Sequence, residues 1–524
     1  MKTCALLICT FAYLNNGVLC KSKVRKFPKS FLFGCSTAAY QIEGGWLEDG
    51  KSLSIWDVAT HSNHSPIKDG TNGDEAADSY HKYKKDIEIA KELNLNFYKF
   101  SISWSRILPT GFANKINGFG LEYYRKLIDG LLAANIQPMA TMYHGDLPYN
   151  LQKLGGWANP LVVDWFFDYA KVLFDKFGDK VKHWVTINEP KDICVGGYGS
   201  ASKAPMVNMS GIAEYICSKN LLLAHAKVYH LYDETYRKLH KGTIGISIGF
   251  YWYEPASEAN DDHQAAVDAR MFDWGQYAHP IFSRAGDYPP EVKRNIALKS
   301  AEQGFPRSRL PELTGSEVAY VRGSADFLGV NSYTIKLAYR DASLYGMYVV
   351  PSYQDDLGAV LVKDPSWAQS ATSWVQEVPW GFYKLLMEIK VLYDNPPVYI
   401  TGTGWPTKGG LLDEDRIVYM RTYLNALLDA LDEDCDIKGY SVWSLIDCFE
   451  WTKGYTEKNG LYEVDFSSAD KTRTPRKSAF VYREIVKSKA LDPDFEPEKF
   501  LVETPDNNNN NNQDKDSYER ESFL

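Results

Sequence analysis

Hydrophobic and polar positions along the chain follow two alternating patterns. Short apolar runs rich in β-branched and aromatic residues are separated by longer stretches in which apolar residues recur at helical spacing. This alternation predicts a parallel sheet covered by helices. The expected strands are residues 31–40, 97–104, 137–143, 182–187, 243–250, 327–333, 397–401 and 437–443. Helical spacing is clearest at residues 86–93, 119–134, 160–177 and 212–238.

Eight parallel strands can form either an open doubly wound sheet or a closed barrel. The even spacing of the strands and the length of 524 residues favour a single α/β domain, a (β/α)8 TIM barrel over residues 27–490. In such a barrel the active-site loops lie at the C-terminal face, so the end of each strand is where functional side chains are expected.

The two ends of the chain differ from its body. Lys2 precedes an apolar run, residues 4–14, that is too short to span a bilayer, and residues 1–20 are predicted to be a signal peptide cleaved after Cys20. The mature protein is therefore expected to be secreted, without a membrane anchor. Residues 493–524, which contain six consecutive asparagines, are predicted to be a disordered tail.

Composition limits the kinds of partner and of structural site that this protein can have. The 58 basic and 67 acidic residues give a net charge of −9 with no long basic run, which argues against a nucleic-acid partner. Cleavage after Cys20 leaves five scattered cysteines, enough for at most two disulfides whose pairing stays open. No Cys/His spacing indicates a metal site. Two sequons become candidate glycosylation sites in a secreted protein, Asn63 and Asn208.

Polar and aromatic residues gather where the expected strands stop. They include Gln41, Arg106, His144, Asn188, Glu189, Asn331, Tyr333, Trp443, Glu450 and Trp451. Amide, imidazole and carboxylate groups bind sugar hydroxyls, and aromatic faces pack on sugar C–H surfaces, so a glycan or glycoside ligand is expected. Gly402-Thr403-Gly404 resembles the start of a dinucleotide fingerprint, but Trp405 follows instead of a helix start. No organic cofactor or metal is expected.

Six motifs together resemble glycoside hydrolase family 1, over residues 27–484. They are Phe31-Leu32-Phe33-Gly34, Gln41-Ile42-Glu43-Gly44, Ser54-Ile55-Trp56-Asp57, Ser103-Trp104-Ser105-Arg106, Thr186-Ile187-Asn188-Glu189-Pro190 and Phe449-Glu450-Trp451. The resemblance implies a retaining β-glycosidase barrel, often a β-glucosidase, with an acid/base Glu after the fourth strand and a nucleophile Glu after the seventh.

The resemblance also implies a role for each residue that matches a functional position of the family. Glu189 becomes the acid/base, Trp374 faces the aglycone and Trp443 forms a platform under the sugar ring. Arg106 and Tyr333 are expected to flank the nucleophile and to face a small cavity in its absence. The residues expected around the non-reducing sugar are Gln41, His144, Asn188, Glu450 and Trp451. Glucosides and related β-glycosides are the expected ligands, while the choice of sugar, the aglycone and the oligomeric state stay open.

The second carboxylate of a retaining glycosidase is missing from this sequence. The family's Ile-Thr-Glu-Asn-Gly reads Ile400-Thr401-Gly402-Thr403-Gly404, and His144 is followed by Gly145 where the family usually carries an aromatic residue. Retaining hydrolysis needs two carboxyl groups about 5–5.5 Å apart, so ordinary turnover is expected to be lost or strongly impaired. The loss also removes one cause of a raised pKa at Glu189. Two hypotheses follow: a glycoside-binding pseudoenzyme, or a β-glucosidase or transglycosidase with an altered mechanism that uses Glu189.

Overall fold

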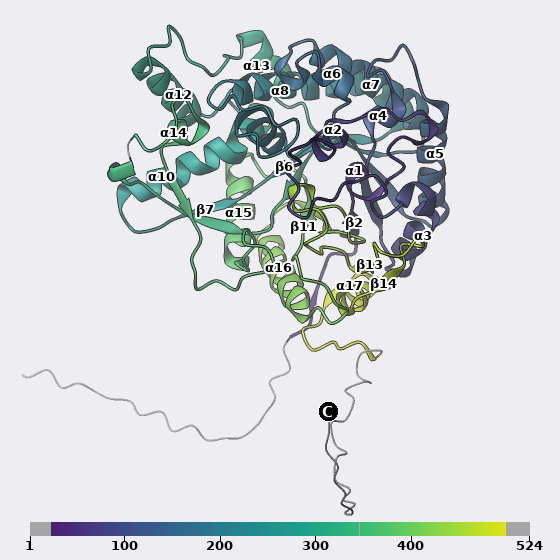
Figure 1. Ribbon diagram of the computed structural model, residues 1–524. Helices are drawn as coiled ribbons and strands as arrows, with labels where there is room; N and C mark the ends of the chain where they lie inside the picture. The colour runs from purple at the N-terminus through teal and green to yellow at the C-terminus, as the bar shows by residue number, and fades with distance from the viewer. Residues whose placement is uncertain (1–22, 345, 499–524) are drawn as a thin grey trace, which may run out of the picture.

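The computed structural model describes residues 23–344 and 346–498 (Figure 1). Eight parallel strands close into one barrel in the order β11-β12-β2-β3-β4-β5-β6-β8. Their bounds are β2 Leu32–Ser36, β3 Phe97–Ser101, β4 Gln137–Tyr143, β5 His183–Asn188, β6 Thr243–Gly249, β8 Phe327–Asn331, β11 Val398–Thr403 and β12 Ile437–Trp443. Strand β12 pairs with β2, from Gly439 opposite Leu32 to Trp443 opposite Ser36, so the ring has no open edge. The single (β/α)8 barrel is confirmed and the open doubly wound sheet is excluded.

The first two strands are shorter than the apolar pattern predicts. β2 ends at Ser36 and is followed by the short helix α1, Ala39–Ile42; β3 ends at Ser101 and is followed by α4, Trp104–Ile107. Every residue of these two short helices is buried. The apolar pattern therefore continues past the end of each strand because the chain stays in the core while it leaves the sheet.

Helices surround the barrel, as Figure 1 shows. The helical stretches recognised in the sequence correspond to α3 Ser79–Glu92, α5 Gly118–Ala133 and α7 Val162–Phe177. The long stretch at residues 212–238 is divided into α8 Ala213–Leu231, a widened turn Tyr232–Tyr236 and the start of α9 Arg237–His240. The later helices α15 Pro379–Leu392, α16 Glu414–Asp432 and α17 Lys477–Ser488 complete the surround. No helix in the described ranges is long and apolar enough to cross a membrane.

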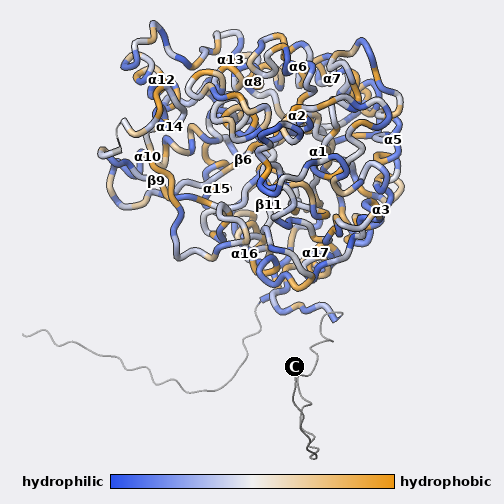
Figure 2. The backbone as a smooth tube through the Cα atoms, viewed as in Figure 1, coloured by the Kyte–Doolittle hydropathy of each residue, from blue (hydrophilic) through white to orange (hydrophobic). Residues whose placement is uncertain are grey.

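The interior of the barrel changes from apolar to polar along the strands. Near the amino ends, Phe97, Met139, Val185 and Phe327 form a small apolar layer. Further along, the Ser247 hydroxyl donates to Thr401 Oγ1 at 3.0 Å, and Thr401 Oγ1 donates to Asn331 Oδ1 at 2.7 Å. These hydrogen bonds satisfy buried hydroxyl groups and connect the packed core to the polar strand ends. Hydrophilic positions accordingly lie near the centre of the face drawn in Figure 2, around β11.

Two smaller sheets lie outside the barrel. β7 Trp252–Pro255, β9 Ile335–Tyr339 and β10 Val360–Val362 form a three-stranded sheet beside the barrel mouth. β1 Arg25–Lys26 pairs with β15 Ala490–Leu491, so the two ends of the described chain meet. The predicted leader, residues 1–20, lies outside the described residues, and so does most of the predicted tail, residues 499–524. The first part of that tail, residues 493–498, is described and contacts the body of the protein. Arg421 donates to Phe495 O and Lys477 pairs with Glu496 at 2.6 Å, so the prediction of a disordered tail is wrong for these residues. The predicted domain limits of 27 and 490 stay predictions.

Candidate functional site

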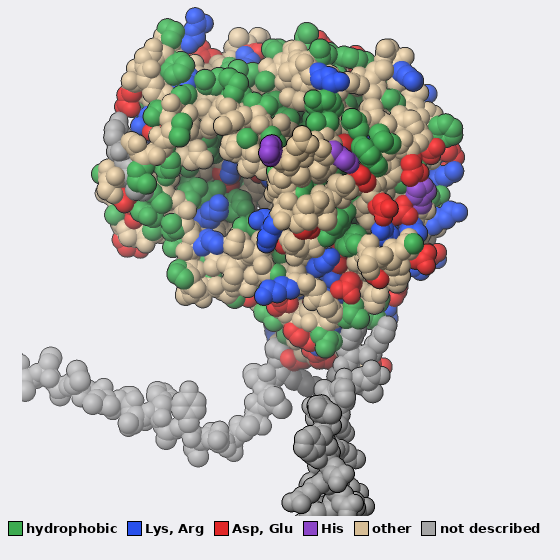
Figure 3. All heavy atoms as spheres, viewed as in Figure 1, with side chains coloured by type: hydrophobic (Ala, Val, Ile, Leu, Met, Phe, Trp, Pro, Cys, Tyr) green, Lys and Arg blue, Asp and Glu red, His purple; other side chains and the backbone are tan. Residues whose placement is uncertain are grey.

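A cavity of about 320 Å³ opens at the carboxyl ends of the barrel strands. Most of the residues expected from the strand ends line it: His144, Asn188, Glu189, Asn331, Tyr333, Trp374, Trp443, Glu450 and Trp451. The space-filling view shows a recess on this face, with Lys and Arg side chains near its edge (Figure 3). Residues from β4, β5, β8, β12 and the loops that follow them are thus brought into one site.

Glu189 directly follows β5 and is held in a strained backbone conformation. Its φ is 53°, in the left-handed region that a residue with a side chain rarely adopts. The backbone N–H of Glu189 donates to Ser247 O at 2.8 Å, and Asn331 Nδ2 donates to Glu189 Oε1 at 2.7 Å. Neighbouring strands therefore fix both the backbone and the carboxylate, which is the kind of support that a preorganised catalytic group needs.

The pKa of Glu189 is raised even though one expected cause, the carboxylate of the seventh strand, is missing. Burial raises it to about 7, with a further contribution from the negative charge of Asp192, although Lys203, Asn331 and Lys99 act in the opposite direction. The expectation considered only the carboxylate on the seventh strand and not desolvation or a second acid on the same segment. A carboxyl group with this pKa carries a proton at neutral pH often enough to act as a general acid.

Asn188 connects Glu189 to two further groups of the cavity. Its Oδ1 accepts from Lys99 Nζ at 2.8 Å and from Asn331 Nδ2 at 3.2 Å, and its Nδ2 lies 3.0 Å from His144 Nε2. Burial, followed by the charges of Lys99 and Lys203, lowers the pKa of His144 well below its ordinary value. His144 is therefore a neutral imidazole that can accept or donate a hydrogen bond.

Glu450 lies at another part of the wall, among three hydrogen-bond donors. Its Oε1 accepts from Trp443 Nε1 at 3.3 Å and from Cys448 Sγ at 3.0 Å, while Gln41 Nε2 lies 3.5 Å from its Oε2. Gln41 itself is buried on α1 behind Glu450 and donates to Phe449 O at 2.8 Å. Gln41 thus supports the segment that carries Glu450.

Aromatic side chains form the remaining wall. Trp374 packs edge-on against Tyr333 with ring centroids 5.5 Å apart, and Trp451 lies 6.0 Å from the imidazole of His144. Tyr251, at the end of β6, lines the same cavity. Flat apolar faces beside amides and carboxylates form the mixture that binds sugar rings.

Gly402 lies near the end of β11, next to Asn331 and Tyr333, which line the cavity. A Cβ built on this residue would stand 3.0 Å from the Tyr333 hydroxyl and 3.0 Å from Asn331 Oδ1, so a side chain here would point toward both groups. Among the described residues, no carboxylate from β11 faces Glu189.

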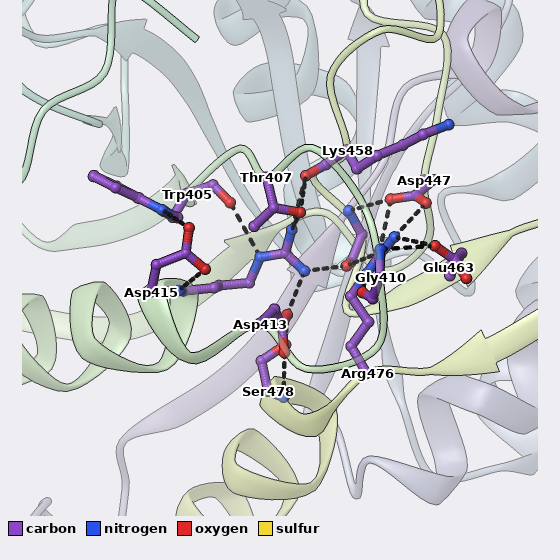
Figure 4. Close-up of polar contacts among 12 residues, drawn as sticks. Trp405, Thr407, Gly410, Asp413, Asp415, Asp447, Lys458, Glu463, Arg476 and Ser478 are labelled. Carbon is purple, nitrogen blue, oxygen red and sulfur yellow. Dashed lines mark hydrogen bonds and ion pairs between the residues drawn. The ribbon is translucent and has the colours of Figure 1, made fainter. Parts of the chain in front are cut away.

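The chain after Gly402 is held by a buried polar network (Figure 4). Arg416 donates to Trp405 O at 3.1 Å and to Lys458 O at 2.7 Å, and it pairs with Asp413 at 2.8 Å. Its neighbour Arg476 pairs with Asp447 through two hydrogen bonds of 2.9 and 2.8 Å. The loop that departs from the family motif is therefore ordered by specific contacts.

Arg106 does not have the expected position. Its guanidinium pairs with Glu43 at 3.0 Å, donates to Gly44 O at 2.8 Å and packs 4.1 Å above the ring of Tyr80. Arg106 lies on α4 and does not line the cavity that contains Tyr333 and Thr401, so the expectation that it flanks the vacant position is wrong. The flanking role was drawn from the family resemblance, and the overlong second strand agreed with it by placing Arg106 at a strand end.

Sequence reasoning missed several groups of the cavity. They are Lys99, Asp192, Lys203, Tyr251, Glu457 and Asn459. Lys99 was detectable as the one charge inside the apolar run of β3, and Asp192 as a second acid three residues after Glu189. Lys203 forms an ion pair with Asp192, but its place at the cavity depends on the loop after β5 and had no local signal.

One cysteine pair is resolved by the structure. Cys194 and Cys217 form a disulfide that joins the helical segment Asp192–Gly199 to α8, while Cys35, Cys435 and Cys448 are free and buried. Asn63 and Asn208 are both exposed, so each sequon is accessible, and glycosylation stays a prediction.

The closed barrel and its cavity define the class of protein. It is a β/α barrel with a cavity of aromatic, amide and carboxylate side chains at the carboxyl ends of its strands. The model of Glycosyl hydrolase family 1 matches residues 23–491, and the chain belongs to this family. It is 45% identical over 464 residues to Myrosinase 1 of Brevicoryne brassicae, covering 88% of this chain and 98% of the relative.

Solved structures give the same result. The aphid myrosinase structure superimposes with a TM-score of 0.84 at 44% identity, covering 89% of this chain and 100% of that one. The β-glucosidase from Thermotoga maritima in complex with castanospermine gives a TM-score of 0.79 at 36% identity, covering 88% of this chain and 99% of that one.

Proposed function

We propose that this protein binds a β-glycoside, such as a β-D-glucoside, and hydrolyses it poorly or not at all. One observation supports this proposal above all. The cavity is lined by aromatic, amide and carboxylate side chains suited to a sugar, but residue 402, where the family resemblance places the nucleophile, is a glycine. Removing a nucleophile from a catalytic unit costs orders of magnitude in rate, because the remaining groups act in concert with it.

Asp192 and Glu450, two other carboxylates of the cavity, are poor replacements for the missing nucleophile. A nucleophile has to attack from the face opposite the acid. Asp192 belongs to the same segment after β5 as Glu189 and is already paired with Lys203. Glu450 is engaged by Trp443 and Cys448. These contacts support a binding role over efficient retaining hydrolysis.

A second candidate function is an altered β-glucosidase or transglycosidase activity. It is favoured by Glu189, whose pKa of about 7 suits a general acid even without the second carboxylate. Water would then attack from the side of Gly402 in an inverting step, without an obvious general base.

Binding and turnover of the same ligand distinguish the two functions. We would titrate 4-nitrophenyl β-D-glucoside calorimetrically and measure nitrophenol release in the unmodified protein, Gly402→Glu and Glu189→Gln. Binding without release, with release in Gly402→Glu raised by about 100-fold or more, is the expected result. Efficient release by the unmodified protein that is lost in Glu189→Gln would instead establish the second function, and absence of binding would contradict both.

We also propose that the protein is exported. The leader-like residues 1–20 and the two accessible sequons support export, and so does the disulfide Cys194–Cys217, because disulfides persist mainly in oxidising compartments. Mass spectrometry of the protein purified from its natural source tests this: cleavage near Cys20 and glycan at Asn63 or Asn208 are expected.

A further inference from the structure

Lys99 is a buried cation without an acidic partner. Nine Lys and Arg residues are buried in the described part of the chain, and eight of them lie within 4 Å of a carboxylate. Lys99 is the exception, although only 1% of its surface is exposed. Its one hydrogen bond among the described residues is to the neutral side chain of Asn188. An unpaired buried charge is costly, so the surroundings of Lys99 favour an anion.

Two side chains connect the unpaired ammonium to the place where residue 402 lacks a side chain. Lys99 Nζ and Asn331 Nδ2 both donate to Asn188 Oδ1, at 2.8 and 3.2 Å, and the Oδ1 of the same Asn331 side chain is 3.0 Å from the Cβ position of Gly402. Lys99, Thr401 and Tyr333 line one continuous cavity. The Tyr333 hydroxyl faces this Cβ position at 3.0 Å and forms no hydrogen bond with any described residue.

We propose that the part of the cavity beside Gly402 is a binding site for a small carboxylate anion, with Lys99 as its counter-ion and the Tyr333 hydroxyl as a hydrogen-bond donor. The site is small because Asn331 and Tyr333 already stand 3.0 Å from the Cβ position, so a planar anion the size of formate or acetate fits better than a tetrahedral one. A charge-assisted hydrogen bond from a buried ammonium supplies the affinity.

Two further observations agree with this site. Burial lowers the pKa of Lys99 to about 8, against the opposing effect of Glu189, so the ammonium keeps its proton below neutral pH. Glu189, whose charge acts on Lys99, is engaged by Asn331 and does not pair with Lys99. An anion in this site would act on Glu189 as a like charge and favour its protonated form.

The inference rests on the proposed glycoside cavity, but it is tested without a glycoside. The probe is sodium [13C]formate at pH 6, titrated into the full-length protein and followed by the formate carbon resonance, with sodium chloride holding ionic strength constant. Lys99→Met removes the charge while keeping an unbranched side chain. Gly402→Glu places a glutamate carboxylate in the site where the anion is proposed to bind. Lys453→Met is the control: it removes another lysine that lines the cavity but has no hydrogen bond to Asn188 or Asn331 among the described residues.

Saturable formate binding is expected in the unmodified protein and in Lys453→Met, with affinities within about twofold of each other. Lys99→Met is expected to weaken it by about tenfold or more, and Gly402→Glu to abolish it. Equal binding in the unmodified protein, Lys99→Met and Gly402→Glu would overturn the inference, as would no binding in the unmodified protein. Calorimetric binding of the glucoside in formate-free buffer is a separate readout, so either proposal can fail while the other stands.

Discussion

Glu189 combines a strained backbone with a carboxyl group whose charge state depends on its neighbours. The negative charge of Asp192, three residues further along the chain, contributes to the raised pKa of Glu189. Burial alone would raise the pKa of Asp192, but the charge and hydrogen bond of Lys203 keep it below the ordinary value. Asp192 is therefore ionised at neutral pH, whereas Glu189, with a pKa of about 7, is only partly ionised.

Replacing Asp192 by Asn tests this coupling. The substitution removes a negative charge that raises the pKa of Glu189 and releases Lys203, whose charge lowers it. The pKa of Glu189 is therefore expected to fall by about one unit, so that the carboxylate forms at lower pH. Side-chain 13C NMR of the carboxyl groups measures the change.

Glu457→Gln is the matched control for this measurement. Glu457 lines the cavity but acts on Glu450 rather than on Glu189, so the pKa of Glu189 is expected to stay in place. If the pKa of Glu189 is the same in Asp192→Asn as in the unmodified protein, desolvation alone raises it.

At the scale of elements, the segment after β5 is anchored at both ends. Glu189 begins it, and the disulfide between Cys194 and Cys217 fastens its continuation, Asp192–Gly199, to α8. Because Asp192 belongs to this segment, the disulfide holds a cavity residue on the same unit as the acid.

The double variant Cys194→Ser/Cys217→Ser is expected to lose about 3 kcal/mol of unfolding free energy, because a bridge over this separation of 23 residues restricts the unfolded chain. Urea unfolding followed by circular dichroism measures the loss. Dithiothreitol should destabilise the unmodified protein by a similar amount and leave the double variant unchanged. A reductant effect of equal size in both proteins would show that the disulfide is not its origin.

At the scale of the whole molecule, a buried ion pair between Arg476 and Asp447 joins segments that are far apart in the chain. Arg476 and Asp447 have fully buried side chains, and Arg476 also donates to Gly410 O and Gly460 O. This group joins the loop after β11, the segment that carries Glu450 and the start of α17. Arg25, by contrast, pairs with Asp429 and Asp432 at the surface, where a quarter of its own side chain and about half or more of each acid remain exposed.

Arg476→Met and Arg25→Met are therefore expected to differ in cost. Arg476→Met leaves Asp447 buried and unpaired and should lower the unfolding free energy by about 3–5 kcal/mol. Arg25→Met should change it by less than about 1 kcal/mol, because surface ion pairs are weak. Thermal and urea unfolding of the two variants measure the difference, and equal losses would contradict the importance assigned to burial.

How far the sequence predicted the molecule can be judged from particular elements. The strands β4 and β12 have their predicted bounds, because an apolar run ended there together with the strand. β2 and β3 were overestimated because the apolar run continued into buried helical turns. The outer sheet of β7, β9 and β10 was not predicted at all, since its short strands have no periodic pattern long enough to recognise.

The sequence by itself determined the eight-stranded barrel, the family and the convergence of Glu189, Asn188 and Glu450 at one mouth. Periodicity and strand order are local properties, and a parallel barrel places all strand ends on one face. Only the tertiary structure decided that Arg106 pairs with Glu43 away from the cavity and that Lys99 is a buried cation there without an acidic partner among the described residues. It also decided that burial and Asp192 raise the pKa of Glu189. Charge pairing and desolvation depend on distances between residues far apart in the chain, and spacing along a sequence does not contain those distances.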